Sequence, residues 1–96
     1  MTKNRDRAKF EKYAEVYKLL ANAKRLEILN LLGSGEKIVT DLVNAMEIRK
    51  ANVSQHLALL RYLKFVKVRR LGKNAFYSLT NPKTVEFFKI MDSINK

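Results

Sequence analysis

The sequence predicts a mainly α-helical domain with one small β-hairpin. In five segments, apolar residues recur every three or four positions, which is the period of a helix with one buried face. Over residues 65–71 the period changes to two, as in a strand, and Gly72-Lys73 then separates this segment from a second strand. A chain of 96 residues, 47% of them hydrophobic, suits a single domain with a small core.

Two helices are expected at the start of the chain. Residues 6–20 carry one apolar stripe, made of Phe10, Tyr13, Ala14, Tyr17 and Leu20. Residues 23–32 are rich in leucine and isoleucine and form the second helix. Gly33-Ser34-Gly35 ends it, because glycine and serine favour turns.

A pair of helices joined by a tight turn is expected next. Ile38-Val39 suits a short strand, and Thr40 is the predicted N-cap of a helix over residues 40–46, with Asp41 favourable in its first turn. After the turn at residues 48–50, a fourth helix spans residues 51–63. Its apolar face holds Val53, Leu57, Leu60 and Leu63, and the opposite face is predicted to hold Asn52, Gln55, His56 and Arg61.

A basic hairpin and a closing helix complete the prediction. The strands span residues 65–71 and 74–79, with Gly72-Lys73 at the tip. Asn81-Pro82 breaks the chain, and Pro82 suits the start of a last helix over residues 82–95. The order α-α-β-α-α-β-β-α predicts a single winged helix-turn-helix domain over residues 1–96.

The charge is concentrated in one interval. Between Glu47 and Glu86 there are nine basic residues and no acidic one, whereas the formal net charge of the whole chain is +11. Such a one-sign stretch within a regular core pattern indicates a surface that meets phosphates. The chain has no cysteine, so disulfides and thiolate metal sites are excluded, and no cofactor is predicted. No apolar run is long enough for a membrane span and the polar first residues show no secretion signal, so the cytoplasm is the expected location.

The predicted reading surface combines the fourth helix with the hairpin. The major groove of double-stranded DNA admits an α-helix, and Asn, Gln, Ser, His and Arg side chains can bond to base edges there. His56, the only histidine, is interpreted as a groove or phosphate contact, the alternative being a helix-surface residue without a role. The predicted DNA-binding residues are Arg49, Lys50, Asn52, Ser54, Gln55, His56, Arg61, Lys67, Arg69, Arg70, Lys73 and Asn74.

Three other classes of function remain open at this stage. The same charge would serve a non-specific, architectural nucleic-acid-binding protein, although backbone binding needs no compact polar set. An enzyme is disfavoured, because the chain has no Gly-rich phosphate loop, metal-ligand spacing or nucleophile-base pair. A protein-interaction module would bind through its outer helices and show no salt-sensitive binding to DNA.

The motifs resemble those of one known family. Ala51-Asn52-Val53-Ser54-Gln55-His56-Leu57, the hairpin and the L-x-x-x-x-R-L-x-I-L pattern of residues 20–29 are similar to the ArsR (ArsR/SmtB) transcriptional repressors. The resemblance covers roughly residues 10–80 and implies a homodimeric repressor that pairs through its first and last helices, binds an operator with two-fold symmetry and responds to an inducer. The wide apolar stripes of both helices also favour a partner. The predicted interface residues are Phe10, Tyr13, Tyr17, Val85, Phe88, Met91 and Ile94. As an alternative, Tyr13, Tyr17, Phe87 and Phe88 could line a ligand pocket between the outer helices.

The sequence departs from the family in three places. Ile38 and Thr40 stand where the arsenic and cadmium sensors carry cysteines, and the last helix offers only Glu86 and Asp92, without histidine, where other members bind metal. No metal site is therefore predicted, and the inducer stays unidentified. Lys64 occupies a position that is usually glycine, where it would adopt a left-handed backbone at a cost of about 1 kcal/mol unless the helix ends differently.

Overall fold

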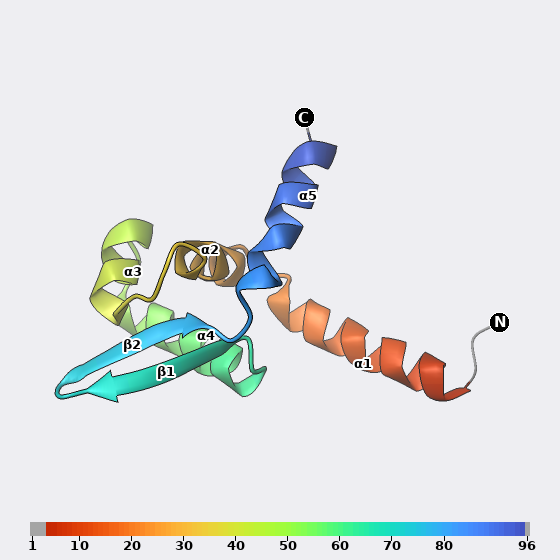
Figure 1. Cartoon of the computed structure of the whole chain (residues 1–96), viewed down its shortest axis with the longest axis horizontal. Helices are drawn as coiled ribbons and strands as arrows, with labels where there is room; N and C mark the ends of the chain where they lie inside the picture. The colour runs from red at the N-terminus through yellow and green to blue at the C-terminus, as the bar shows by residue number, and fades with distance from the viewer. Residues whose placement is uncertain (1–3, 96) are drawn as a thin grey trace.

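The computed structural model describes residues 4–95 and contains a helical core unit, a two-stranded wing and two projecting helices (Figure 1). The predicted order of elements is confirmed, apart from the short strand at Ile38-Val39. The elements are α1 (Asn4–Leu20), α2 (Ala23–Leu32), α3 (Val39–Met46), α4 (Lys50–Tyr62), β1 (Val66–Leu71), β2 (Asn74–Leu79), the 3-10 helix η1 (Pro82–Val85) and α5 (Glu86–Ile94).

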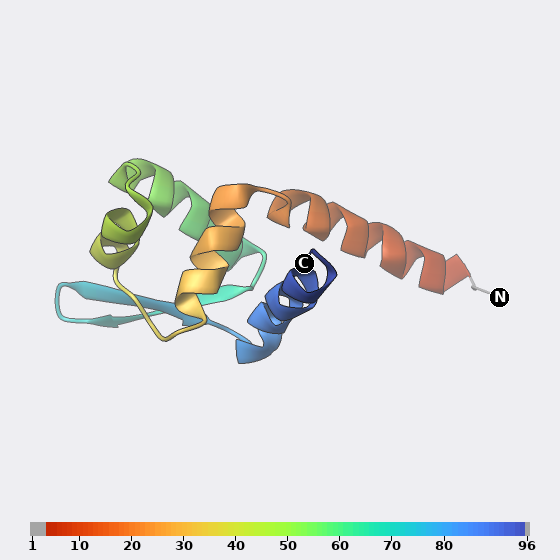
Figure 2. The same ribbon diagram turned by 90° about the horizontal axis from the view of Figure 1, so that it is seen from above.

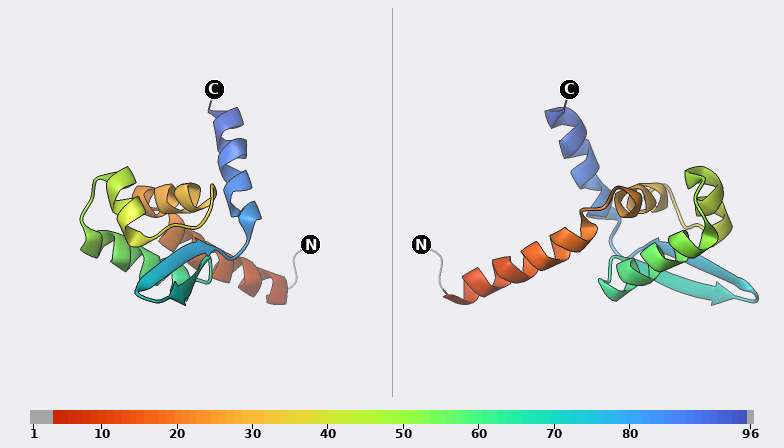
Figure 3. Two further views of the ribbon diagram at one scale, coloured as in Figure 1. Left: turned by 60° about the vertical axis from the view of Figure 1, so that its left-hand side comes forward. Right: turned by 180° about the vertical axis from the view of Figure 1, so that it is seen from behind.

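The core lies where α2, α3 and α4 meet the base of the hairpin. Its buried residues are Leu20, Ile28, Leu29, Leu32, Leu42, Val53, Leu57, Leu60, Val66 and Leu79. Helices α1 and α5 extend away from this unit in all the ribbon views (Figures 2 and 3), and the molecule measures 51 × 34 × 22 Å. Among the described residues of α1, only Leu20 belongs to the buried core.

The start of α3 differs from the prediction. Its N-cap is Ile38, in an extended conformation, and Thr40 lies within the first turn of the helix. The carboxylate of Asp41 accepts a hydrogen bond from the backbone N–H of Ile38 (3.1 Å), so the cap is supplied from inside the helix. The predicted strand at Ile38-Val39 is also wrong, because the only bridge there joins Lys37 to Tyr77.

The junction between α4 and the wing confirms the left-handed backbone predicted for Lys64, whose φ is +68°. The N–H groups of Lys64 and Phe65 donate to the carbonyl oxygens of Arg61 and Leu60, each at 2.9 Å, which is the Schellman pattern of a helix end. The hydroxyl of Thr80 donates to the Lys64 carbonyl (2.7 Å) and ties this corner to the end of β2. Lys64 therefore adopts at a steric cost the conformation that glycine adopts freely.

The last helix begins with a tighter turn than predicted. Pro82 starts the segment as expected, and the Asn81 side chain accepts from the N–H of Lys83 (2.9 Å). Residues Pro82–Val85 form a 3-10 helix, and the α-helix α5 begins only at Glu86.

Candidate DNA-binding surface

Helices α3 and α4 form a helix-turn-helix around a shared apolar contact. Leu42 of α3 and Val53 of α4 are both fully buried in the core that joins them. Glu47 ends α3 in the left-handed conformation (φ +55°), and Arg49, in an extended conformation, is the N-cap of α4. The turn is therefore only a few residues long, and it holds the N-terminal end of α4 at the edge of the unit (Figure 1).

The exposed face of α4 carries most of the predicted reading residues. Asn52, Ser54 and Gln55 are exposed, and so are Arg49, Lys50 and Arg61. Within residues 4–95, none of these six side chains forms a hydrogen bond or ion pair inside the protein. Their donors and acceptors are free to bind another molecule, and no acidic side chain in α4 opposes the positive ones.

His56 lies at the border of that face, one helical turn after the exposed Asn52, and its predicted contact with DNA stays a prediction. It is half-buried, and its Nδ1 accepts a hydrogen bond from Nε of Arg25 in α2 (3.3 Å). Burial, and then the charges of Arg25 and Lys24, lower the pKa of the His56 imidazole below its ordinary value.

The wing presents a mostly unpaired set of basic residues. Lys67, Arg70, Lys73 and Asn74 are exposed. Strands β1 and β2 pair antiparallel, with Val66 opposite Leu79 at the base and Leu71 opposite Asn74 at the tip. Lys67, Arg70 and Lys73 form no ion pair within the described part of the chain, so three basic groups of the wing are available to an anionic partner.

Arg69 is the exception, because an acid from outside the interval neutralises it. Its Nη2 and Nε lie 2.6 and 3.1 Å from the two carboxylate oxygens of Glu36, in the loop between α2 and α3. Its guanidinium also lies over the ring of Phe76, its partner across the hairpin, 4.5 Å from the ring centroid. The hydrogen bond from Arg69 holds the pKa of the Glu36 carboxyl below its usual range. Arg69 is therefore less available to DNA than its neighbour Arg70.

Tyr62 is a surface residue that the sequence interpretation missed. Its side chain is 79% exposed at the end of α4 and lines a groove of about 540 Å³ between α4 and β1, together with Arg61 and Lys67. The signal was present in the spacing, since Tyr62 lies seven residues after Gln55 and so falls on the same stripe of the helix.

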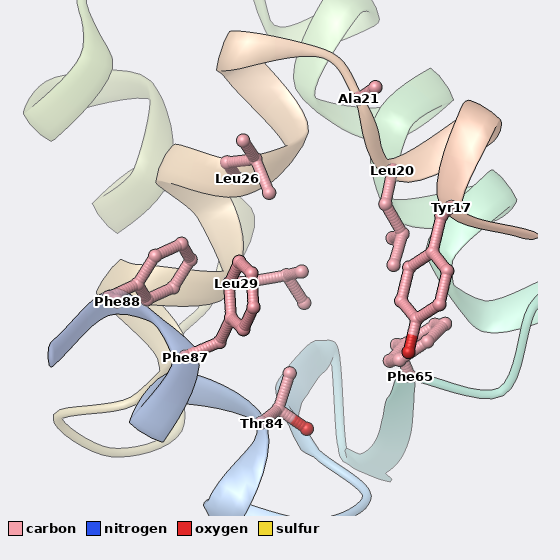
Figure 4. A pocket seen from close by; sticks show the side chains of 9 residues that line it. All are labelled: Tyr17, Leu20, Ala21, Leu26, Leu29, Phe65, Thr84, Phe87 and Phe88. Atoms are coloured by element: carbon pink, nitrogen blue, oxygen red, sulfur yellow. The ribbon is translucent and has the colours of Figure 1, made fainter. Parts of the chain in front are cut away.

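An apolar cavity of about 660 Å³ separates α1 from α5 (Figure 4). Tyr17 from α1 and Phe87 and Phe88 from α5 line it, Leu29 of α2 lies between them, and Phe65 lies beside Tyr17. Beyond the cavity, exposed apolar residues continue along both helices. These residues are Phe10, Tyr13, Ile90, Met91 and Ile94.

The predicted dimer surface stays a prediction, and exposure on α5 changes which of its residues could take part. Val85 and Phe88 are half-buried against the chain's own core, so they are only partly available to a partner. Phe87, Ile90 and Ile94 are 61%, 52% and 67% exposed and form the outward stripe of α5. The outward stripe differs from the predicted one because the side of the segment that carries Val85 and Phe88 packs against the core.

Among residues 4–95, no three histidine, cysteine, aspartate or glutamate side chains lie together in a way that could hold a metal ion. No helix of the described chain is long and apolar enough to cross a membrane.

A helix-turn-helix whose second helix offers free polar side chains, flanked by a basic hairpin, defines a winged helix-turn-helix protein of the DNA-binding class. Residues 22–68 match the model of a family described as "Bacterial regulatory protein, arsR family". The chain belongs to this arsR family, as its relatives also indicate.

Two relatives and one solved structure illustrate the similarity. A transcriptional repressor SmtB homolog of Synechocystis is 34% identical over 82% of this chain and 60% of its own length. The transcriptional repressor PagR of Bacillus anthracis is 34% identical over 84% of this chain and 82% of its own. The solution structure of the homodimeric winged helix-turn-helix DNA-binding domain of Mb0332 from Mycobacterium bovis has a TM-score of 0.79 and 29% identity, covering 98% of this chain and 87% of that one.

Proposed function

We propose that this chain is a homodimeric transcriptional repressor that binds an inverted-repeat operator in double-stranded DNA. The observation that carries the proposal is the exposed face of α4, where Asn52, Ser54 and Gln55 have no partner within the described protein. Unpartnered side chains of these types suit the reading of base edges in the major groove. The phosphate contacts are assigned to Arg49, Lys50, Arg61, Lys67, Arg70, Lys73 and Asn74, with Tyr62 added in the groove beside β1.

The apolar surfaces of α1 and α5 support the dimer. Phe10 and Tyr17 on α1, and Phe87, Ile90 and Ile94 on α5, are each more than half exposed. Exposed apolar groups on this scale are costly in water, and burying them against a second copy removes the cost. A two-fold dimer would present two copies of α4 to successive turns of the major groove, which predicts an inverted repeat.

Selection of bound duplexes from a random pool tests the proposal. The expected result is one enriched sequence with two-fold symmetry, and an affinity that falls steeply with salt because phosphate contacts release condensed cations. A pool that shows no enrichment, with strong salt-sensitive binding to all duplexes, would instead favour a non-specific architectural protein. Binding that is weak and insensitive to salt would contradict both.

Two matched variants separate the reading of bases from contacts with phosphates. Gln55→Ala should reduce the preference for the selected duplex over random duplex by about tenfold, because it removes a contact with a base edge. Arg70→Ala should weaken binding to both duplexes by a similar factor and make the salt slope shallower by about 0.9 for each copy of the chain. If Arg70→Ala left the affinity for random duplex unchanged, the assignment of the wing would be wrong.

A further inference from the structure

The side chain of Arg25 joins three helices. It lies in the first turn of α2 and is half-buried. Its Nη1 donates to the carbonyl oxygen of Leu19, 2.6 Å away in the last turn of α1. Its Nε donates to Nδ1 of His56 in α4, 3.3 Å away. One guanidinium therefore contacts both the end of the proposed dimerisation helix and the recognition helix.

The position of Arg25 is itself held by the cap of α2. Its backbone N–H donates to the side-chain oxygen of Asn22 (3.2 Å), which also accepts from Lys24. A guanidinium is planar and its donors point in set directions, so two acceptors bound to it cannot move independently. The Leu19 carbonyl is one of the last in α1, where carbonyls lack helical partners and a positive group is favourable.

The contact requires one protonation state of His56. Nδ1 can accept only when it carries no proton, so the ring is neutral with its proton on Nε2. Burial and the neighbouring charges of Arg25 and Lys24 favour this neutral form by lowering the pKa. His56 follows directly after the exposed Gln55 in the chain, so a displaced His56 would rotate or shift the reading face.

Helix α1 has few other attachments to the rest of the chain. Of its described residues only Leu20 is buried, with Val16 packed beside the core. Besides the two-residue link to α2, only a small apolar contact and the two hydrogen bonds of Arg25 hold the angle between α1 and α4. In a dimer paired through α1 and α5, this angle also determines the distance between the two copies of α4.

We propose that Arg25 is a positioning residue that holds α4 against the end of α1, through His56 and the Leu19 carbonyl, so that the dimer accepts one spacing of operator half-sites. This inference rests on the proposed function, because it presumes a dimer that reads two half-sites. Arg25 need not contact DNA; it acts through the helices that it joins.

The test compares Arg25→Gln with Lys24→Gln in the full-length protein. Both changes remove one positive charge from the first turn of α2, but only the first removes the hydrogen bonds to Leu19 and His56. The DNA probes are the duplex selected from the random pool and the same duplex with one base pair inserted between its half-sites. Arg25→Gln should reduce the preference for the uninserted duplex on the order of tenfold, whereas Lys24→Gln should retain it.

Equal spacing preference in the two variants would overturn the proposal. If Arg25→Gln lowers the melting temperature enough to unfold the protein, Arg25→Lys takes its place. Lysine keeps the charge but has one nitrogen and cannot bind both acceptors in the same geometry, so it should lose the spacing preference too. Retention of the full preference by Arg25→Lys would likewise overturn the proposal.

Nitrogen NMR of His56 tests the contact without DNA. His56 is the only histidine, so its ring signals need no assignment by mutation. The wild type and Lys24→Gln should show an unprotonated Nδ1 and a proton on Nε2, and Arg25→Gln should lose this single tautomer. An unchanged tautomer in Arg25→Gln would overturn the contact itself. If the pool yields no specific duplex, the proposed function fails and the positioning role fails with it, while the ring signals still show whether the contact exists.

Discussion

Replacing Glu36 by glutamine should make the protein bind DNA more tightly, although Glu36 lies outside the helix-turn-helix. The carboxylate of Glu36 accepts two hydrogen bonds from Arg69, at 2.6 and 3.1 Å, and is the only acidic group paired with a wing cation within residues 4–95. The variant removes this negative charge and frees Arg69, which then resembles Arg70 in its availability to phosphates.

The size of the effect follows from the number of arginines released. Each newly neutralised phosphate steepens the plot of log affinity against log salt by about 0.9, so two copies of the chain give at most about 1.8. At about 0.15 M salt this corresponds to at most about 30-fold in affinity. The side chains of Arg69 and Glu36 are 55% and 35% exposed, so salt already screens their attraction, and we expect an increase of about three- to tenfold.

Fluorescence anisotropy with a labelled duplex at several salt concentrations measures both quantities. Glu11→Gln is the matched control, because it removes the same charge from α1, far from the wing (Figure 1). Arg69→Gln should cost little affinity in the wild type, and adding it to Glu36→Gln should abolish the gain. The reasoning is refuted if Glu36→Gln leaves the salt slope unchanged, or if Glu11→Gln steepens it equally.

Three further changes test the corner of the wing, the buried histidine and the dimer. Lys64→Gly should raise the free energy of unfolding by about 0.5–1 kcal/mol in urea denaturation, because glycine adopts a left-handed backbone without steric cost. The pKa of His56 is lowered in the folded state, so the unfolded chain takes up its proton first as the pH falls. The free energy of unfolding should therefore decrease as the pH drops from about 7 through the ordinary histidine range, and His56→Asn, which keeps an acceptor but does not titrate, should reduce this decrease. Ile94→Glu, at the 67% exposed end of α5, should raise the dimer dissociation constant more than about tenfold in sedimentation, with little change in helix content.

Each of these expectations has a clear contrary result. Alanine at position 64 would still pay the steric cost of the left-handed backbone, whereas glycine would not. Equal stability of Lys64→Ala and Lys64→Gly would therefore show that this cost does not limit stability. If stability depended on pH identically in the wild type and in His56→Asn, His56 would not contribute to that dependence, and the carboxylates would account for it. A fully dimeric Ile94→Glu protein would exclude the outward stripe of α5 from the interface.

Local patterns in the sequence predicted most of the elements and several of their boundaries. The bounds of α2 and β2 match the prediction residue for residue, and the other helices of the core unit differ by only one residue at an end. The left-handed backbone at Lys64 was one of two alternatives that the resemblance to the family offered, because the family usually has glycine at this position. The N-cap of α3 was assigned wrongly to Thr40. The helix begins earlier, with Ile38 as its N-cap, and the Asp41 carboxylate accepts a hydrogen bond from the backbone N–H of Ile38.

The sequence alone determined where the positive charge lies and that cysteine takes no part, because composition is a property of the chain itself. The side chains that read bases stay a prediction. Only the tertiary structure decided which of those charges are free. Arg69 meets Glu36 across 33 residues and His56 meets Arg25 across 31. No local pattern encodes such pairs, because they depend on how segments distant in the sequence pack against one another. The acid-free interval is thus a property of the sequence, whereas the neutralised arginine and the half-buried histidine within it are properties of the fold.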